Sequence, residues 1–437
     1  MKTFKGGHYI PGNKHLTKNA AIELMPIVPD YYVALSQHIG EPAILCVEIG
    51  ETVCEGQLIA KANGIISANV HSPVCGTVVE VVKRRNSQGV MADFVHIKSN
   101  GEQNVVTYEP LTNPTREQIV QRIADAGIVG MGGAGFPTAA KIQTKNPLDT
   151  LIINVAECEP YLNCDNRLVI ERTKEFIEGV RLLATACGVQ HVYIGIEDNK
   201  PADYAAMLAI DGVVDEKGPI TPGDIVVVKL KEKYPQGAEK MLVYACTKRK
   251  VPTGCLPSAV GCIVNNAATA YAVWDAVVNG RPLYKRLMTL SGRGIRCPKN
   301  VEVRIGTPLP FILEMCDNLT DDTVKLVVGG PMMGFTLVDT NVTITKVDRG
   351  FLALTAKEAS TTLPTPCIRC GRCVDVCPMH LTPLMIDFSA TVNDFEGAIK
   401  YGALNCFECG TCAYVCPAKR PIVQSVRLTK IKAKEIK

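Results

Sequence analysis

The sequence has 437 residues, a formal net charge of +4 and a hydrophobic content of 47%. A chain of this length exceeds what a single core normally organises, so we expect three or four domains. Charged residues make up 21% of the chain, which is typical of a globular rather than a disordered protein. The small net charge argues against a nucleic-acid-binding protein, which normally carries a concentrated basic face.

Nothing in the sequence predicts a signal peptide or a membrane-spanning helix. The opening segment MKTFKGGHYIPGNK lacks an apolar stretch, and the most apolar long segment, 261–278, is interrupted by Asn265, Asn266 and Asp275. We therefore expect a protein that is soluble or is held at a membrane by partners. In a reducing compartment, its 19 cysteines are more typical of metal ligands than of disulfides.

Residues 35–82 contain two similar units, VEIGETVCEGQLIAKA (47–62) and ANVHSPVCGTVVEVV (68–82). Both alternate apolar and polar residues and carry glycines at turns, which predicts two β-hairpins. The pattern resembles a barrel-sandwich hybrid of the lipoyl or biotinyl type. The turn at 64–69, where such domains present a modified lysine, contains no lysine. We therefore expect a structural module and not a swinging arm.

The segment GMGGAGFPTAAK (130–141) is a glycine-rich loop in which Gly130, Gly132 and Gly135 match G-x-G-x-x-G. A Rossmann loop must follow a strand, but helical spacing precedes this loop and the first strand, LIINV (151–155), follows it. A Walker A loop needs Gly-Lys-Ser/Thr, which is absent. The remaining alternatives are a plain turn between helices and an anion site. Pro137 suits a first helical turn and Lys141 adds positive charge, which favours an anion site at a helix start.

The next hundred residues predict βαβ units with a parallel sheet. Expected strands at 151–155, 191–196 and 225–230 flank a long helix at about 166–187. The acidic loop NVAECEPYLNCDNR (154–167) leaves the carboxyl end of its strand, where open α/β sheets bind ligands. Burying the acids Glu157, Glu159 and Asp165 unpaired would be costly, so we expect them to face solvent or a polar ligand. A solvated turn remains the alternative.

The C-terminal region contains two matching cysteine runs, CIRCGRCVDVCP (367–378) and CFECGTCAYVCP (406–417). Each reads C-x2-C-x2-C-x3-C-P, the spacing that binds [4Fe–4S] clusters, with the fourth cysteine ligating the other cluster. The spacing thus assigns one cluster to Cys367, Cys370, Cys373 and Cys416, and the other to Cys406, Cys409, Cys412 and Cys377. Structural zinc is the alternative, but zinc normally needs four ligands and not two complete runs.

The segments beside these runs carry weaker signals. Between the runs, Asn393 followed by Glu396 predicts the start of a helix, and the spacer length favours a helical ferredoxin module. The basic end RLTKIKAKEIK (427–437) is expected to be a solvated tail, with contact to lipid or a partner as the alternative.

Taken together, these motifs resemble two related families. GMGGAGFPTAAK is similar to the flavin loop of the FMN-binding, 51 kDa-type subunits of respiratory complex I, and NVAECEPYLNCDNR is similar to their Asn-x-x-Glu-x-Glu-Pro loop. The whole chain resembles the RnfC family, the NADH-side subunits of the membrane Rnf complex. The segments that carry this resemblance are TFKGG (3–7), SQHIGEPA (36–43), HSPVCGTV (71–78), YPQGAEKML (234–242), GGPMMGF (329–335) and the two cysteine runs.

The resemblance implies a multidomain α/β protein that binds FMN, NAD(H) and two [4Fe–4S] clusters. The expected parts are a barrel-sandwich hybrid (1–110), a complex I 51 kDa-like, Rossmann-type α/β domain for FMN and NADH (111–284), an SLBB-like β-grasp insert (285–355), a helical ferredoxin module (356–420) and the basic tail (421–437). The implied cofactor-binding residues are Gly130, Gly132, Gly133, Gly135, Phe136, Thr138, Lys141 and Asn154. Glu157 and Glu159 are implied to lie near the nicotinamide or the flavin.

The implied activity is electron transfer. A hydride moves between nicotinamide and FMN, and single electrons then pass through the clusters to a partner. The partners would be the other Rnf membrane subunits, at the cytoplasmic face of the membrane, in a ferredoxin:NAD+ oxidoreductase that translocates Na+ or H+. Two alternatives remain. The first is a soluble cytoplasmic paralogue that serves another reductase, such as proline reductase, or a ferredoxin. The second is a flavin-free electron carrier.

The chain departs from these families at several cysteines. Cys158 and Tyr161 stand where the complex I family prefers glycine, and Cys255 and Cys262 stand where small or aliphatic residues are expected. Lone cysteines are usually buried small hydrophobic residues. A redox-active Cys255 is the alternative.

Overall fold

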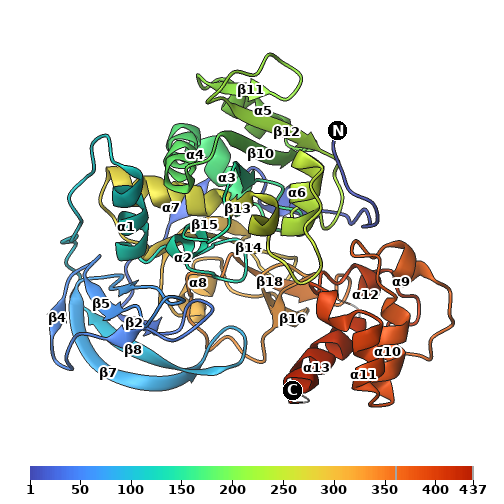
Figure 1. Cartoon of the computed structure of the whole chain (residues 1–437). Coiled ribbons are helices and arrows are strands. Elements are labelled where there is room, and N and C mark those ends of the chain that lie inside the picture. Colours follow the sequence, from blue (N-terminus) through green and yellow to red (C-terminus); the bar gives the residue numbers. More distant parts are fainter. Residues whose placement is uncertain (360–361, 436–437) are drawn as a thin grey trace.

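The computed structural model describes residues 1–359 and 362–435. Figure 1 shows the N-terminal strands at one end of the molecule, the α/β region above them, and the C-terminal helices packed as a separate group at one side. The strands of the third region lie between the α/β region and the C-terminal helices. None of the described helices combines the length and the apolar character needed to cross a membrane.

The N-terminal region is a sandwich of two small antiparallel sheets, with the strand orders β2-β8-β7-β4 and β3-β5-β6. The strands are β2 (Asp30–Ala34), β3 (Ile44–Leu45), β4 (Thr52–Val53), β5 (Leu58–Lys61), β6 (Val70–His71), β7 (Gly76–Arg85) and β8 (Met91–Ser99). The barrel-sandwich prediction is confirmed, but the prediction of two hairpins is wrong. Each expected hairpin sends one strand to each sheet: β4 pairs with β7, whereas β5 pairs with β3 and β6.

The α/β region contains a five-stranded sheet in the order β11-β12-β10-β9-β13, with every neighbouring pair parallel. Its strands are β9 (Thr150–Asn154), β10 (His191–Glu197), β11 (Val213–Asp215), β12 (Ile225–Leu230) and β13 (Cys262–Asn266). Its helices are α1 (Arg116–Asp125), α2 (Thr138–Ile142), α3 (Cys164–Glu171), α4 (Thr173–Cys187), α5 (Pro201–Leu208), α6 (Glu239–Thr247) and α7 (Ala267–Val278). The three predicted strands are present within one residue at each end.

The single helix predicted at about 166–187 is instead two helices, α3 and α4. Arg172 interrupts them with a non-helical backbone (φ −133, ψ 44). Its guanidinium is held by the carboxylate of Glu302, 2.7 Å away, on a strand of the next region. The residue at the break thus makes a distant contact that the local sequence does not reveal. The predicted end at Gly188 is confirmed, because this residue adopts the left-handed cap conformation.

The third region is a six-stranded mixed sheet in the order β1-β15-β14-β18-β16-β17, covered by the short helix α8 (Leu309–Glu314). Its strands are β1 (Ile22–Leu24), β14 (Lys285–Ser291), β15 (Lys299–Arg304), β16 (Thr323–Val328), β17 (Phe335–Thr336) and β18 (Gly350–Thr355). The edge strand β1 comes from the N-terminal segment and pairs with β15. Residues 1–24 thus contact other regions, since Lys2 also bridges to Leu230 and His8 to Tyr234.

The C-terminal region consists of short helices, as the spacer between the cysteine runs predicts. They are α9 (Arg372–Asp375), α10 (Pro383–Thr391), α11 (Phe395–Lys400), α12 (Thr411–Tyr414) and α13 (Ile422–Glu435). The cap of α11 is Asp394 and not Asn393, since the Asp394 carboxylate accepts the amide of Gly397 at 2.8 Å.

The predicted solvated tail is wrong for the part that the structure describes. Helix α13 packs against α10 and α11 and buries Ile422, Val426 and Ala433. Leu428 and Ile431 of the basic stretch are exposed, but the buried positions Val426, Thr429 and Ala433 recur at helical spacing, so one face of the helix enters the core of the module. Residues 436–437 lie outside the described residues.

Candidate functional site

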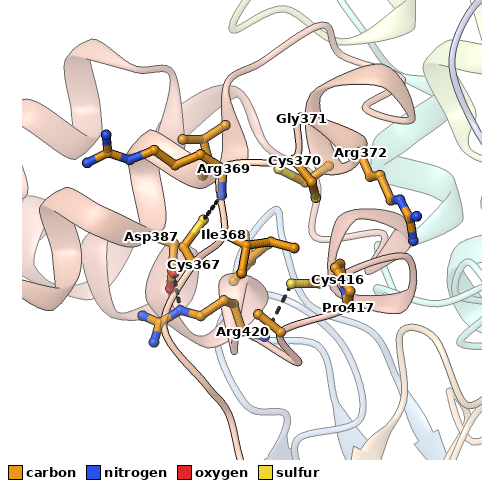
Figure 2. Close-up of a pocket in the computed structure, with 14 residues that line it drawn as sticks. Cys367, Ile368, Arg369, Cys370, Gly371, Arg372, Asp387, Cys416, Pro417 and Arg420 are labelled. Atoms are coloured by element: carbon orange, nitrogen blue, oxygen red, sulfur yellow. Dashed lines mark hydrogen bonds and ion pairs between the residues drawn. The ribbon is translucent and has the colours of Figure 1, made fainter.

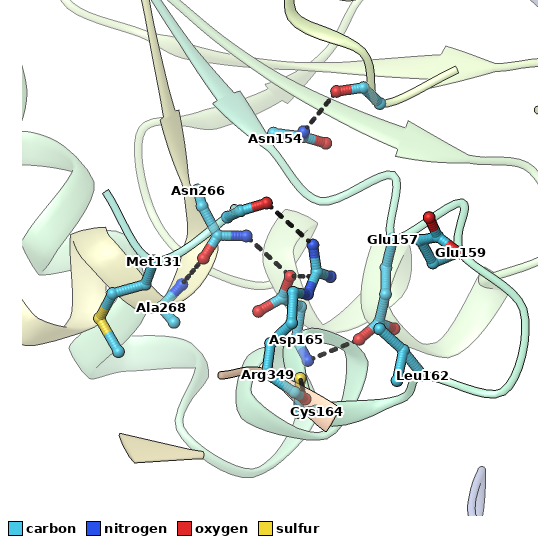
Figure 3. Close-up of polar contacts among 12 residues, drawn as sticks. Met131, Asn154, Glu157, Glu159, Leu162, Cys164, Asp165, Asn266, Ala268 and Arg349 are labelled. Carbon is cyan, nitrogen blue, oxygen red and sulfur yellow. Dashed lines mark hydrogen bonds and ion pairs between the residues drawn. The ribbon is translucent and has the colours of Figure 1, made fainter. Parts of the chain in front are cut away.

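The carboxyl edge of the parallel sheet is polar at two neighbouring strands. Strands β9 and β13 end at Asn154 and Asn266, which are register partners. Asn154 donates to the carbonyl of Gly237 at 2.8 Å. Asn266 caps α7 by accepting the amide of Ala268 at 2.9 Å, and its Nδ2 donates to Asp165 at 2.7 Å (Figure 3). This edge is where open α/β sheets bind ligands.

The glycine loop lies beside this edge. A Cβ atom on Gly132 would stand 3.1 Å from the Cβ of Asn266, and the amide of Met131 donates to Thr269 on α7 at 3.0 Å. Gly132 and Gly133 are exposed, and a Cβ on Gly133 would meet no atom within 4 Å. The loop therefore presents bare backbone to open space next to the polar edge.

The start of the following helix differs from the expectation. The loop closes on itself through a bridge between Val129 and Pro137 and a bond from the Gly130 amide to the Phe136 carbonyl at 2.8 Å. Helix α2 begins only at Thr138 and has five residues. So short a helix supplies little dipole, and any anion held here would depend mainly on the loop's own N–H groups.

Lys141 does not point freely into the loop. Its ammonium donates to the carboxylate of Glu239 at 2.8 Å and to the carbonyl of Val264 at 2.6 Å. It therefore ties α2 to α6 and to β13. Thr138 is buried, and its hydroxyl oxygen has no partner among the described residues.

The expectation that the three acids face solvent is wrong, because all of them are buried and bonded to protein groups, and their place beside a ligand stays a prediction. Glu157 accepts the amides of Asp165 at 2.8 Å and Asn166 at 3.4 Å, so it caps the start of α3. Lys14 and Lys200 lie 3.9 and 3.7 Å from the same carboxylate. These lysines come from remote segments, which is why the sequence pattern did not reveal the pairing.

Glu159 connects the acidic loop to the third region. Its carboxylate accepts the amides of Met332 at 3.1 Å and Met333 at 3.0 Å, within the GGPMMGF segment. Burial raises the pKa of Glu159, and the two amides and Arg349 oppose that rise. The Glu159 carboxylate is thus a hydrogen-bond acceptor held between the acidic loop of the α/β region and the third region.

Tyr234 connects this junction to the second cysteine run. Its hydroxyl donates to the carbonyl of Cys409 at 2.8 Å and lies 3.4 Å from Glu159. Cys158, Met332 and Ile10 belong to the same small apolar cluster as Tyr234 and Cys409. The sequence placed Tyr234 in a family segment but gave no sign of this contact.

The two cysteine runs fold in the same way. In each run the first sulfur accepts the amide two residues later, Arg369 at 3.4 Å and Glu408 at 3.3 Å. The fourth sulfur in each run, of Cys377 and of Cys416, accepts an amide four residues later at 3.4 Å. Amide donors of this kind stabilise cysteine thiolates and tune iron–sulfur clusters.

One pocket brings together four thiols from both runs. It is lined by Cys367, Cys370 and Cys373 of the first run and by Cys416 of the second (Figure 2). Arg420 and Asp387, which form an ion pair at 2.7 Å, close one side. Four convergent sulfurs with amide donors are the donor set of a [4Fe–4S] cluster, so these residues fit the group.

The four remaining run cysteines, Cys377, Cys406, Cys409 and Cys412, form a second group of thiols. Burial raises the pKa of the Cys412 thiol, and the neighbouring thiols of Cys409, Cys406 and Cys377 raise it further. Burial likewise raises the pKa of Cys406 to about 11, with Cys409 and Cys377 again beside it. The structure therefore brings the fourth cysteine of each run to the first three of the other.

The cysteines outside the runs differ in their exposure. Cys164, Cys187, Cys246 and Cys262 are buried, whereas Cys255 is exposed in the loop before β13. Cys158 lies against Gly237, whose amide it accepts at 3.4 Å, and burial raises its thiol pKa to about 12. A redox role for Cys255 stays a prediction.

Comparison with protein families supports three parts of this architecture. Residues 2–102 match the "RnfC Barrel sandwich hybrid domain", residues 123–275 the "Nuo51 FMN-binding domain" and residues 366–419 the "4Fe-4S dicluster domain". An NAD+-reducing [NiFe]-hydrogenase has a similar fold, with a TM-score of 0.51 at 18% identity over 76% of this chain and 68% of that one.

Several curated proteins are similar over nearly the whole chain. The C component of the ion-translocating oxidoreductase complex of Rhodobacter capsulatus is 42% identical over 99% of this chain and 83% of its own length. The C component of the proton-translocating ferredoxin:NAD(+) oxidoreductase complex of Clostridium ljungdahlii is 39% identical over 98% and 94%. The Na(+)-translocating counterpart of Acetobacterium woodii is 38% identical over 98% and 96%. The chain therefore belongs to the RnfC family of ion-translocating oxidoreductase complexes.

Proposed function

We propose that this protein transfers electrons between NAD(H) and a partner, as the peripheral RnfC component of an Rnf-type ferredoxin:NAD+ oxidoreductase. The observation that carries the proposal is the hydrogen bond from Tyr234 to Cys409. Tyr234 follows β12 of the α/β region and lies beside Glu159 of the acidic loop, so its bond to the Cys409 backbone carbonyl links that region to the run that carries a thiol set suited to a [4Fe–4S] cluster. The relatives named as parts of ferredoxin:NAD(+) oxidoreductase complexes support this assignment.

FMN would bind at the polar carboxyl edge of the parallel sheet. The exposed backbone of Gly132 and Gly133 would receive its phosphate, with Gly130 and Gly135 providing the turn and Phe136 and Thr138 its support. Asn154 would hold the neighbouring loops in place through Gly237. When bound, FMN supplies the conversion between two-electron hydride transfer and one-electron transfer.

The acids would have different roles. Glu159 lies at the junction that faces the cysteine run and would set the electrostatic environment of the nicotinamide and flavin. Glu157 caps α3 and pairs with lysines, so it would fix the position of Asp165 and not contact a ligand. Lys141, paired with Glu239, would brace the loop from behind.

The eight run cysteines would hold two [4Fe–4S] clusters. One set would be Cys367, Cys370, Cys373 and Cys416, and the other Cys377, Cys406, Cys409 and Cys412. The amides that donate to the sulfurs would stabilise the thiolate ligands.

Anaerobic purification of the whole chain tests the proposal. We expect bound FMN, iron, and bleaching of the flavin absorbance on addition of NADH. Cys370→Ala is the matched control, because it should lose about half of the iron but keep FMN and bleaching in the first turnover. A protein that contains iron but neither retains nor binds FMN would support the flavin-free carrier instead. Zinc in place of iron would refute the cluster assignment.

Attachment to the cytoplasmic face of the membrane is part of the proposal and needs its own measurement. In native cells, the chain should sediment with membranes and be released by high salt without detergent. If all of the protein instead stayed in the supernatant when the membranes were first sedimented, before any high-salt wash, the result would favour the soluble paralogue.

A further inference from the structure

The segment Thr345–Arg349, which leads into β18, reaches from the third region to both ends of the glycine loop. Figure 3 shows the Arg349 side chain directed toward Asp165 and the loop backbone. Neither the family match to the FMN-binding domain, which covers residues 123–275, nor the loop motif includes this segment.

Arg349 makes two directed bonds with its guanidinium. Nη1 donates to the carbonyl of Gly132 at 3.3 Å, and Nη2 donates to the carboxylate of Asp165 at 3.1 Å. Asp165 also accepts Nδ2 of Asn266 at 2.7 Å, and Asn266 packs under Gly132. The loop, α3, the end of β13 and the third region thus meet in one hydrogen-bonded network.

Two neighbouring side chains fix the loop on either side of this contact. Lys346 donates to the carbonyls of Gly127 at 2.7 Å and Asn69 at 2.6 Å, which joins the base of the loop to the barrel. Val347 packs on Gly135, where a Cβ atom would stand 2.5 Å from its Cγ1. Gly135 has a φ of +68, so a glycine is needed there both for conformation and for space.

The bond to Gly132 also determines where the loop directs its donors. The carbonyl and the N–H of one peptide unit point in opposite directions. Holding the Gly132 carbonyl on Arg349 therefore turns the Gly133 amide away from the guanidinium, at a residue that is exposed and has free space beside its Cα. An anion that approached from that side would meet the amide directly.

We propose that Arg349 is a positioning residue for the flavin phosphate, so that the third region, which carries Arg349, is a working part of the flavin site. Arg349 acts through the Gly132 carbonyl and its partner Asp165 and does not touch the flavin. This inference rests on the proposed binding of FMN by the glycine loop.

The test compares Arg349→Gln, Arg349→Lys and the unchanged protein, each freed of flavin and titrated with FMN and with riboflavin. We expect the FMN dissociation constant of Arg349→Gln to rise about tenfold, which equals ~1.4 kcal/mol. The riboflavin constant should change less than twofold, because riboflavin has no phosphate. Arg349→Lys keeps the charge beside Asp165 but cannot donate to Asp165 and to Gly132 with two separate nitrogens. Its FMN dissociation constant should therefore lie between those of the unchanged protein and Arg349→Gln. General damage to the fold would weaken both flavins together.

Arg296→Gln is the matched control. Arg296 belongs to the third region, as Arg349 does, and its half-exposed guanidinium pairs with the exposed Asp321 at 3.4 Å. This variant should bind FMN as the unchanged protein does.

If Arg349→Gln fails to fold, the FMN and riboflavin constants of Arg349→Lys provide the test instead. An FMN constant within twofold of the unchanged protein in the Arg349 variants, or equal losses for FMN and riboflavin, would overturn the inference. If the unchanged protein itself binds no FMN, the proposed function fails and the inference fails with it.

Discussion

Glu197, at the end of β10, is a single carboxyl whose protonation should be visible in the stability of the protein. Burial raises its pKa to about 7, although Lys200 and Lys14 oppose the rise. The folded chain then holds a proton that the unfolded chain has lost, so the free energy of unfolding should fall as pH rises from about 4.5 to about 7. The upper limit of this loss is ~3 kcal/mol, from 1.36 kcal/mol per pKa unit.

Glu197→Gln should remove that part of the pH dependence. Its Tm, measured by calorimetry without oxygen, should exceed that of the unchanged protein at pH 8 and match it near pH 5. Glu396→Gln, at an exposed position, should shift Tm equally at both pH values. A Glu197→Gln effect that is the same at pH 5 and pH 8 would contradict the assignment.

Tyr234→Phe isolates the bond between the acidic-loop junction and the second cysteine run. The hydroxyl donates to the backbone carbonyl of Cys409, which offsets the negative end of that carbonyl dipole near the cluster and so favours the extra electron of the reduced form. Removing it should lower the midpoint potential of the cluster held by Cys409 by about 40 mV, which is ~1 kcal/mol for one electron. A redox titration followed by electron paramagnetic resonance measures both clusters.

The cluster held by Cys367 should keep its potential in this variant. Tyr244→Phe, on α6, provides the control, because the ring of Tyr244 contacts Lys248. Equal shifts of both clusters in Tyr234→Phe would indicate a general change in the module and not the loss of one bond.

Single residues were predictable from the sequence where their partners are local. The cluster cysteines follow from spacing because all eight lie in two short runs, and the structure groups them as the spacing predicts. The burial of Glu157 and Glu159 did not follow, because Lys14, Lys200 and the Met332 amide are remote in sequence. Arg349 was missed for the same reason, since no local pattern connects it to the loop.

At the scale of elements, the N-terminal segment joins the sheet region to the cluster module. The amide of Gly7 donates to the carbonyl of Val376 at 2.8 Å, and Gly6 lies against Cys377 with a φ of +83. A Cβ on Gly6 would stand 2.7 Å from the Cys377 carbonyl oxygen. Gly6→Ala should therefore cost about 1–2 kcal/mol in backbone strain and shift the ligand Cys377.

Iron release to a chelator measures this effect. Gly6→Ala should release about half of its iron faster than the unchanged protein does, since only one cluster uses Cys377. Gly12→Ala is the control in the same segment, because its Cβ would meet only the Lys14 side chain at 3.5 Å. Identical release curves for Gly6→Ala and Gly12→Ala would show that the segment does not support the ligand.

Strands and helices were predicted best where the hydrophobic pattern is long and regular. The buried strands β9, β10 and β12 appear within a residue of their predicted limits. The barrel hairpins failed because alternation shows that a segment is a strand but not which sheet receives it. Strands β4 and β5 are very short, and the turn between β4 and β5 carries the chain from one sheet to the other.

For the whole molecule, the exchange of fourth cysteines between the runs means that each cluster takes ligands from both runs of the C-terminal module. Cys370 and Cys416 line one pocket although they belong to different runs, whereas Cys409 and Cys416 share a run but serve different thiol sets. Double variants distinguish this arrangement from ligation within each run. Each single alanine variant should first retain about half of the iron.

Cys370→Ala combined with Cys416→Ala should still retain about half of the iron, because both changes remove the same cluster. Cys409→Ala combined with Cys416→Ala should leave almost none, because each change removes a different cluster. Ligation within runs predicts the reverse for both pairs. Iron analysis and the paramagnetic signal of the surviving cluster therefore decide between the two arrangements, and a single variant that loses all iron would show that neither cluster forms without the other.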